Sequence, residues 1–361
     1  MLSEVEAANL VARREPMKVL VTGAHGYIGS VTVPLLRAAG HQVTGLDALY
    51  YRDCDLFSAD ATLLVHADVR DLVADQLAGF DAVVHLAALS NDPLGELDRE
   101  LTMEINFRAT VRLARAAKEA GVERFVFSSS CSMYGASGED DLVGEDAPLR
   151  PLTAYAESKV RAEEALAQLA GDGFTPVFMR NATAYGVSPR LRIDLVLNNL
   201  VGWAHTTGAV RILSDGTPWR PLVHVEDIAG AALAALEAPA EVVRGEAFNV
   251  GAANENYQVR ELAEIVRGTV GDCTVEYAGR GDPDPRSYRV DFGKLKRALG
   301  SFSTRWTAYA GAAELLDAYR GAGLDLESFE GPRYTRLKRL RELLDSGALD
   351  SRLRWRAAPA R

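Results

Sequence analysis

The chain has 361 residues, 48% hydrophobic and 25% charged, with a formal net charge of −10 at neutral pH. This composition is typical of a globular protein with one or two domains, and the negative charge argues against a nucleic-acid partner. No apolar run is long enough to span a membrane. Three scattered cysteines, Cys54, Cys131 and Cys273, are too few for a disulfide framework or a metal site. We therefore expect no metal, no membrane and a cytoplasmic location.

The first predicted strand, residues 19–22, leads into a glycine-rich turn and then into a helical pattern that ends near Gly40. In such a unit the first glycine permits a tight turn, the second lets the backbone approach a pyrophosphate, and the third allows close helix–strand packing. The N-terminus of the helix adds N–H donors for phosphate. This context favours a dinucleotide site over an ordinary strand–turn–helix junction. The residues expected to bind the cofactor here are Gly23, Gly26, Tyr27, Ile28 and Gly29.

A carboxylate follows the second predicted strand, residues 42–46. Asp47 comes 18 residues after the third glycine, where a carboxylate accepts hydrogen bonds from the hydroxyl groups of an adenosine ribose. Because a carboxylate repels a 2′-phosphate, Asp47 predicts NAD rather than NADP; the alternative is an exposed Asp at a strand end. The next predicted strands, residues 63–66 and 82–86, end beside residues over which a cofactor can lie: Asp68, Val69, Leu86, Ala87 and Ala88.

Hydroxyl groups follow a later strand. Residues 101–120 form a predicted helix with one apolar stripe, and Asn106 lies off that stripe. The strand predicted at residues 124–127 then runs directly into three serines that end at Ser130. Ligands in open α/β sheets bind at the carboxyl ends of the parallel strands. Ser130 is therefore a candidate site residue, although a serine run is also common in plain loops.

Tyr155 and Lys159 are four residues apart on a predicted helix and therefore share one face. A Tyr side chain normally titrates near ~10, but an adjacent ammonium group favours the phenolate. Tyr155 can then act as a proton acceptor near neutral pH. Such a pair is common in helices by chance, so its interpretation depends on the glycine turn and the serine run.

Strands alternate with helices along the chain, which predicts an α/β fold: a Rossmann-type doubly wound parallel sheet with a smaller, mixed C-terminal substrate lobe. Residues 1–16 are expected to be an N-terminal extension. The dinucleotide-binding domain is predicted at residues 17–184, with residues 222–250 returning to it. Residues 185–221 and 251–361 are predicted to form the substrate lobe and the C-terminal helices.

These motifs, together with the stretches at residues 85–88, 133–135 and 220–225, resemble those of the extended short-chain dehydrogenases/reductases. The resemblance is to their NAD-dependent nucleotide-sugar epimerase and dehydratase group. It implies that Ser130 orients a substrate hydroxyl group, that Tyr155 is the acid/base, and that Lys159 binds the nicotinamide ribose and lowers the pKa of the tyrosine. It also implies NAD as cofactor, with Asn106 among its contacts, a nucleotide-sugar substrate, and a homodimer formed through residues 101–120 and 154–170.

Substrate contacts are expected in the second half of the chain. The resemblance implies Thr183 and Asn199, with Thr183 standing where the family has an asparagine. The two phosphates of a nucleotide sugar need cationic donors, and arginine suits them because its fork can bind bidentately. Arg220 and Arg286 are the expected donors, and the weaker candidates are Arg190 and Arg192.

Two departures from the family pattern narrow the reaction. The 4,6-dehydratases of the family carry Asp-Glu directly after the serine of the triad, where this chain has Cys131 and Ser132. Because the chain lacks this Asp-Glu pair, no carboxyl group is expected to protonate the leaving 6-hydroxyl or to take the C5 proton. Cys131 also stands one position before the catalytic cysteine of the similar 3,5-epimerases, so a small buried residue is expected there.

The predicted function is an NAD-dependent nucleotide-sugar epimerase that acts at C4 through a transient keto sugar. The alternative is an NAD(P)H-dependent reductase of a 4-keto nucleotide sugar, which would use the same triad but exchange its cofactor. A non-catalytic dinucleotide-sensing protein ranks last, because such proteins commonly lose the tyrosine or lysine and this chain has both.

Overall fold

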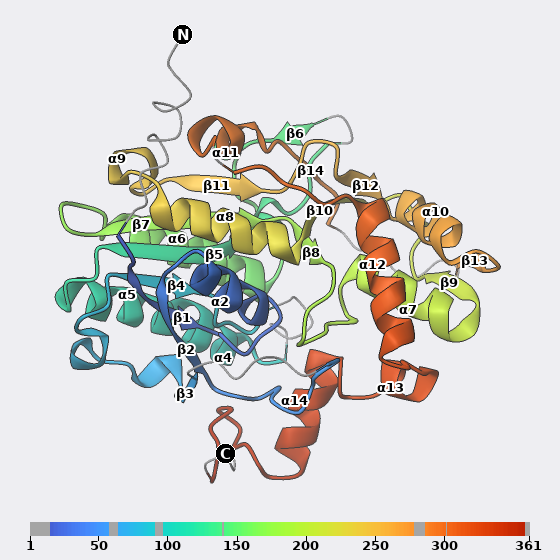
Figure 1. Ribbon diagram of the computed structural model, residues 1–361, viewed down its shortest axis with the longest axis horizontal. Helices are drawn as coiled ribbons and strands as arrows, with labels where there is room; N and C mark the ends of the chain where they lie inside the picture. Colours follow the sequence, from blue (N-terminus) through green and yellow to red (C-terminus); the bar gives the residue numbers. More distant parts are fainter. Residues whose placement is uncertain are drawn as a thin grey trace.

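The computed structural model describes residues 15–57, 64–90, 97–138, 141–277, 286–300 and 302–357. A parallel sheet of seven strands forms the centre of this described part, in the order β11-β7-β5-β4-β1-β2-β3 (Figure 1). This confirms the predicted α/β, doubly wound fold. The strands are β1 Lys18–Thr22, β2 Gln42–Asp47, β3 Leu64–His66, β4 Ala82–His85, β5 Arg124–Ser130, β7 Thr175–Asn181 and β11 Ala247–Val250.

Alternate side chains of the sheet enter two separate apolar clusters, one on each face. Val19 and Val21 of β1 belong to one cluster and Leu20 to the other, as the two-residue period of a strand requires. Burial of both faces explains why these strands are short continuous apolar runs. The helices are α2 (Gly29–Ala38) and α8 (Val225–Glu237) on the first face, and α5 (Ala109–Glu119) and α6 (Ala154–Ala167) on the second.

The strand order reverses beside β1, which has β2 on one side and β4 on the other. Open α/β sheets bind ligands in the crevice at such a reversal, outside the carboxyl ends of the strands. Gly23 directly follows β1 with φ of 71°, and the segment after β4 passes very close to it. A Cβ atom on Gly23 would lie 2.7 Å from the backbone nitrogen of Ala87. Glycine is thus required there by both conformation and space.

Smaller sheets form a second lobe beside the main sheet. One has three strands, β12-β10-β8, and two pairs join β13 to β9 and β14 to β6. β10 begins three residues before the predicted boundary at residue 222 and belongs to the small sheet. The strands are β6 Leu142–Val143, β8 Thr183–Tyr185, β9 Ala209–Ile212, β10 Trp219–His224, β12 Asn256–Gln258, β13 Thr274–Tyr277 and β14 Arg289–Val290. The helices of this lobe are α7 Val196–Thr207, α10 Val259–Val270, α12 Ala308–Gly321 and α13 Leu326–Glu330. The short helices α9 Ala240–Val243 and α11 Gly293–Ala298 pack on the first face of the main sheet.

The helix predicted at residues 101–120 is helical but not uniform. It consists of α4 (Arg99–Thr102), a π-helical stretch (Met103–Arg108) and α5. π-Helical turns are rare and occur frequently at functional sites. Asn106 lies in this wider turn.

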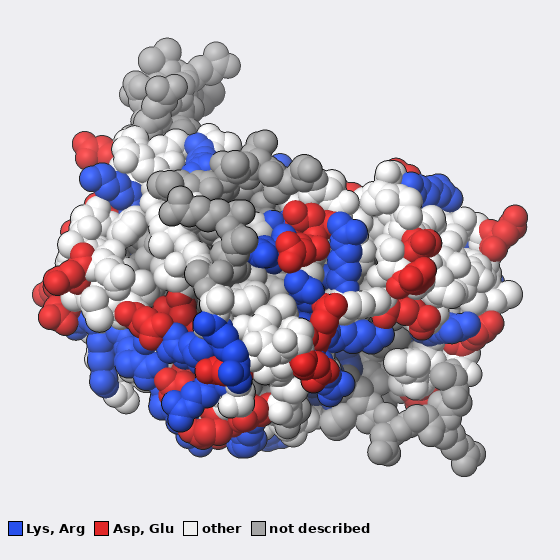
Figure 2. Space-filling view, turned by 90° about the horizontal axis from the view of Figure 1, so that it is seen from below, with Lys and Arg blue, Asp and Glu red and all other residues white. Residues whose placement is uncertain are grey.

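The last helix, α14 (Arg336–Asp345), and the residues after it return to the first domain (Figure 1). Leu340, Leu343 and Leu353 pack against Leu89 and Ile105 of that domain. The expected N-terminal extension lies outside the described residues as far as residue 14. None of the described helices is long and apolar enough to cross a membrane. On the face shown in Figure 2, basic side chains are interspersed with acidic ones.

Candidate active site

A pocket opens at the strand reversal, and the residues expected to bind a dinucleotide line it. Its floor is the glycine turn, and its wall is formed by segments that follow β2, β3 and β4. The predicted residues found in its lining are Gly23, Gly26, Tyr27, Ile28, Gly29, Asp47, Asp68, Val69, Leu86, Ala87 and Ala88. The structure thus brings together residues from four separate strand ends.

The glycine turn leaves no room for larger residues. A Cβ atom on Gly29 would lie 2.1 Å from the carbonyl oxygen of Gly23. Ser30 donates its hydroxyl to the oxygen of Gly26 over 2.8 Å, and Tyr27 donates to the oxygen of Gly186 over 2.7 Å. The turn is therefore held rigidly at the N-terminus of α2, where backbone N–H groups favour a phosphate.

Asp47 is half-buried at the end of β2 and is held by two backbone groups. It accepts hydrogen bonds from the nitrogen of His25 over 3.0 Å and the nitrogen of Leu49 over 2.7 Å. Burial raises the pKa of Asp47, while these two N–H donors and the nearby Arg336 act against that rise. A carboxylate in this position can accept from ribose hydroxyl groups.

The predicted Ser/Tyr/Lys triad lies in an adjoining cleft of about 560 Å³. Ser130 is the last residue of β5, and its hydroxyl donates to that of Ser132 over 3.0 Å. Tyr155 lies in the first turn of α6, which Thr153 caps by accepting from the nitrogen of Ala156. All three predicted residues line the cleft, so the structure brings them together at one sheet edge.

Lys159 is 3% exposed and fixed by its hydrogen bond to the main chain. Its Nζ donates to the oxygen of Ser128 over 2.6 Å and lies 5.7 Å from the centre of the Tyr155 ring. Burial lowers the pKa of Lys159 to about 7, and Glu163 acts in the opposite direction. A buried amine poised near neutral pH is a common mark of a functional site.

The two cavities adjoin each other, because five residues line both. The shared residues are Ile28, Leu86, Ala88, Ser90 and Arg192. A ligand that starts at the glycine turn can therefore extend to the triad, which is the path a dinucleotide needs.

The four residues expected to contact substrate also line the cleft: Thr183, Asn199, Arg220 and Arg286. Asn199 donates its side-chain amide to the oxygen of Ile193 over 3.0 Å. Arg220 donates to the oxygens of Trp219 and Arg286. These bonds hold Arg220 beside Arg286, and the two supply positive charge at the end of the cleft away from the glycine turn.

The two weaker arginine candidates differ in position. Arg192 lines both cavities and forms an ion pair with Asp194 over 2.9 Å. Arg190 lines neither of the two cavities and instead contacts Asp55 and His25.

Asn106 is fully buried and does not line either of the two cavities. Its Oδ1 accepts from the nitrogen of Leu89 over 2.8 Å, and its Nδ2 donates to the oxygen of Leu89 over 3.1 Å. Asn106 therefore positions the segment after β4, and we assign it that role in place of a direct contact.

Two residues near the cavities were not singled out from the sequence. Asn181 ends β7 next to Ser130 in the sheet register, and its Nδ2 donates to the hydroxyl of Ser128 over 3.0 Å. Its Oδ1 is buried without a hydrogen-bond partner among the described residues, and the side chain lines the cleft. Asn181 could have been identified from the sequence, because it stands at the carboxyl end of a parallel strand, where ligands bind. Arg336 lines the glycine-turn pocket although it lies 307 residues after Gly29, the last glycine of the turn, and no sequence motif marks it.

Cys131 is confirmed as a small buried residue. Its Sγ donates to the oxygen of Arg180 over 3.1 Å, and burial raises the pKa of the thiol. Among the residues that the structure describes, no group of three or more His, Cys, Asp or Glu side chains is arranged to hold a metal ion.

These features define a dinucleotide-dependent enzyme with a Ser/Tyr/Lys site on a Rossmann-type sheet. Residues 19–251 match the model of the NAD dependent epimerase/dehydratase family. The chain belongs to this family. The residues present fit NAD: a glycine turn without space for a side chain, a carboxylate at the end of β2, and a buried Arg336 nitrogen that lacks a hydrogen-bond partner among the described residues.

Named relatives and solved structures agree with this family. The chain is 34% identical over 304 residues to a UDP-glucose 4-epimerase of Corynebacterium glutamicum, which covers 79% of this chain and 90% of that protein. A structure of MoeE5 in complex with UDP-glucuronic acid and NAD superposes with a TM-score of 0.72 at 30% identity, covering 84% of this chain and 99% of MoeE5. The UDP-glucose 4-epimerase of Thermus thermophilus in complex with NAD gives a TM-score of 0.71 at 26% identity, covering 85% and 100%.

Proposed function

We propose that this chain is a nucleotide-sugar epimerase that acts at C4 through a transient keto sugar. The observation that carries the proposal is the composition of the 560 Å³ cleft. The cleft adjoins the NAD pocket, and the Ser/Tyr/Lys triad lies in its lining. Arg220 and Arg286 also line it and can donate hydrogen bonds to a diphosphate. The names of the relatives support a UDP-sugar, since several are UDP-glucose 4-epimerases.

In the proposed reaction Tyr155 removes the proton from the C4 hydroxyl group of the sugar and later returns it. Ser130 accepts or donates a hydrogen bond at that same oxygen and orients it. Lys159 stabilises the phenolate of Tyr155 by its charge and donates to the ribose of the cofactor. Bound NAD supplies hydride transfer from and back to C4. Arg220 and Arg286 hold the diphosphate, so that the keto sugar can turn over and present its other face.

Dehydration is disfavoured by the acid/base groups in the cleft. Loss of a 6-hydroxyl group needs an acid to protonate it and a base at C5. Asp194 is the one carboxylate among the described residues that line the cleft, and it is paired with Arg192. Cys131 is buried and does not line the cleft, and Ser132, which does, carries a hydroxyl group in place of a carboxyl group.

A 4-keto-sugar reductase would use the same triad, so cofactor turnover must separate the two reactions. We would supply purified protein with UDP-glucose and UDP-galactose, without added cofactor, and follow the sugar by NMR. Epimerisation in D2O without deuterium at C4 supports the proposal, because the hydride then returns within the site. In a parallel assay with NAD added, a 4-keto sugar that forms only with stoichiometric reduction of that NAD to NADH would overturn it in favour of the reductase working in reverse. Binding of NAD without turnover of any tested nucleotide sugar would favour the sensing protein.

We also propose that the protein is a homodimer, with α5 and α6 at the contact. Each helix carries an exposed arginine in an ion pair, Arg112 of α5 with Glu104 of the π-helical stretch and Arg161 of α6 with Glu157, so the contact would be partly polar. Light scattering across a range of protein concentrations tests this.

A further inference from the structure

The adenosine end of the NAD pocket is covered by the end of the chain. We call residues 336–357, which comprise α14 and the loop after it, the C-terminal clasp. Arg336, its first residue, is 3% exposed and lines the pocket beside Gly23, Gly26 and Asp47. Its guanidinium lies 4.0 Å from the centre of the Tyr51 ring, and its Nη2 donates to the oxygen of Arg190 over 3.0 Å.

The other nitrogen of this guanidinium, Nη1, is buried and has no hydrogen-bond partner among the described residues. Arg190 and Arg192 nearby are paired with Asp55 and Asp194. Arg336 has no ion-pair partner in the described part of the chain. A buried cationic donor without a partner is costly, and this one lines a pocket whose floor, the glycine turn, suits a diphosphate.

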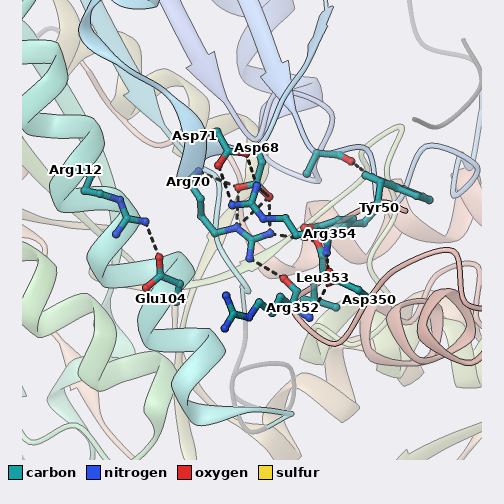
Figure 3. Close-up of polar contacts among 12 residues, drawn as sticks. Tyr50, Asp68, Arg70, Asp71, Glu104, Arg112, Asp350, Arg352, Leu353 and Arg354 are labelled. Atoms are coloured by element: carbon teal, nitrogen blue, oxygen red, sulfur yellow. Dashed lines mark hydrogen bonds and ion pairs between the residues drawn. The ribbon is translucent and has the colours of Figure 1, made fainter. Parts of the chain in front are cut away.

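The rest of the clasp is tied to the three segments that follow β2, β3 and β4. Figure 3 shows Tyr50 of the first segment and Asp68, Arg70 and Asp71 of the second beside the clasp. After β2, Tyr50 donates to the oxygen of Leu353 over 2.6 Å and Trp355 donates to the oxygen of Ala48 over 2.6 Å. After β4, Leu89 packs against leucines of the clasp. The clasp therefore closes over the ends of the same strands that line the pocket.

The contacts after β3 are ionic. Arg354 lies 3.2 Å from the carboxylate of Asp68 and donates to Asp71 over 2.9 Å. Arg70 pairs with Asp68 and donates to the oxygens of Arg352 and Leu353 (Figure 3). Burial alone would raise the pKa of Asp68, but these arginines lower it, so the pairs stay charged near neutral pH.

We propose that Arg336 binds the diphosphate of NAD and that the C-terminal clasp must open before NAD can leave. The clasp lies outside the residues matched by the family model, which end at residue 251. Arginine suits a diphosphate because each of its N–H groups can donate to an anionic oxygen. The proposal concerns cofactor binding and holds for either an epimerase or a reductase, so its failure would leave the proposed reaction untouched.

The first experiment measures NAD affinity by calorimetry for the parent, Arg336→Met and Arg336→Lys. Met keeps the stem over Tyr51 and removes the charge. Because hydrogen bonds to charged groups are worth roughly 1.5–3 kcal/mol, we expect Arg336→Met to lower the affinity for NAD about 10- to 100-fold. The Lys variant should recover part of this affinity. Arg341→Met, an exposed position on the same helix, is the control and should match the parent. NAD affinity of Arg336→Met within twofold of the parent would overturn the proposal. So would a loss confined to NADP, since Arg336 would then recognise a 2′-phosphate.

The second experiment measures release of NAD from the protein as purified, by exchange against isotopically labelled NAD. Arg354→Gln and Trp355→Phe loosen the clasp without touching the glycine turn, and we expect release several-fold faster than in the parent. Unchanged release in both variants would overturn the gating role. If Arg336→Met fails to fold, hydrogen exchange of the parent decides alone: NAD should slow exchange of the amides in residues 336–357, and no change there would overturn the proposal.

Discussion

The side chain of Lys159 donates to the main-chain oxygen of Ser128 over 2.6 Å, which fixes the amine against the carboxyl end of β5. The strand that carries Ser130 therefore also anchors the lysine that we propose to assist Tyr155. A flexible lysine would lose rotamer freedom whenever cofactor or substrate bound. Here the fold has already ordered it, so the triad is preorganised before a ligand arrives.

Tyr155→Phe should remove most of the turnover while leaving the fold and NAD binding intact. The change deletes one oxygen and keeps the ring. A positioned acid/base contributes on the order of a hundred- to ten-thousand-fold in rate, so we expect a loss in that range. Lys159→Ala should impair both turnover and NAD binding, and Ser130→Ala should be milder than either. Near-parental turnover by folded, NAD-loaded Tyr155→Phe would remove the tyrosine from the mechanism.

Lys159 should make the stability of the cofactor-free protein depend on pH. Its pKa is lowered from its ordinary value of 10.5 to about 7 in the folded state, so between those values the unfolded chain binds more protons. Stability from this group therefore rises with pH across that window and is lowest below pH 7. Between pH 6.5 and 9 the free energy of unfolding should rise by roughly 2 to 3 kcal/mol more in the parent than in Lys159→Met. Urea titrations of both proteins, stripped of NAD in the same way, measure the difference, and parallel curves would contradict it.

Asp47 should select NAD over NADP. Asp47→Ala removes the carboxylate that we expect to accept from the ribose and to repel a 2′-phosphate. The affinity for NAD should therefore fall about 10- to 100-fold, and the preference for NAD over NADP should become smaller. Affinities for both cofactors, measured beside the exposed Asp75→Ala as a control, test this. An unchanged preference would mean that Asp47 does not set it.

Arg220→Ala should lower the affinity for the nucleotide sugar without changing the affinity for NAD. Arg220 lines the substrate end of the cleft and is absent from the lining of the glycine-turn pocket. The loss of one charged donor predicts that the UDP-sugar binds about 10- to 100-fold more weakly. Calorimetry with each ligand separates the two effects. Equal loss of both would point to a disturbed fold.

Asn106→Leu should destabilise the protein. The substitution keeps the volume but leaves the backbone N–H and C=O of Leu89 without their buried partners. Each unsatisfied group costs about 1–3 kcal/mol, so the free energy of unfolding should fall by roughly 2 to 6 kcal/mol. Urea denaturation checks the stability. A variant as stable as the parent would show that water replaces the amide.

The parts of the fold and site that were predictable are those specified locally. The glycine turn, Asp47 and Ser130 stand directly at the ends of apolar strands, and a parallel sheet brings all such ends to one edge. Tyr155 and Lys159 share a helix face because of helical spacing. In each case a short stretch of sequence carries both the element and the position of the residue.

The parts that were not predictable depend on contacts between distant segments. Asn106 stands in a helical pattern, and its role follows from the path of Leu89 and the π-helical turn around it. Basic residues on a helix usually form a solvated face, yet the side chain of Arg336 in the basic helix α14 is buried and lines the pocket. Helical periodicity indicates which residues share a face, but only tertiary structure decides what that face meets.

The leucines of α14 have a consequence for how the protein is made. Leu89 and Ile105 are buried by Leu340 and Leu353, which are separated from them by more than two hundred residues. Because ribosomes add about 5–20 residues per second, the apolar surface around Ile105 stays uncovered for roughly 10 to 50 seconds during synthesis. A nascent chain thus completes its first domain only after residues 336–357 have left the ribosome, and chains truncated before residue 336 would keep that surface exposed.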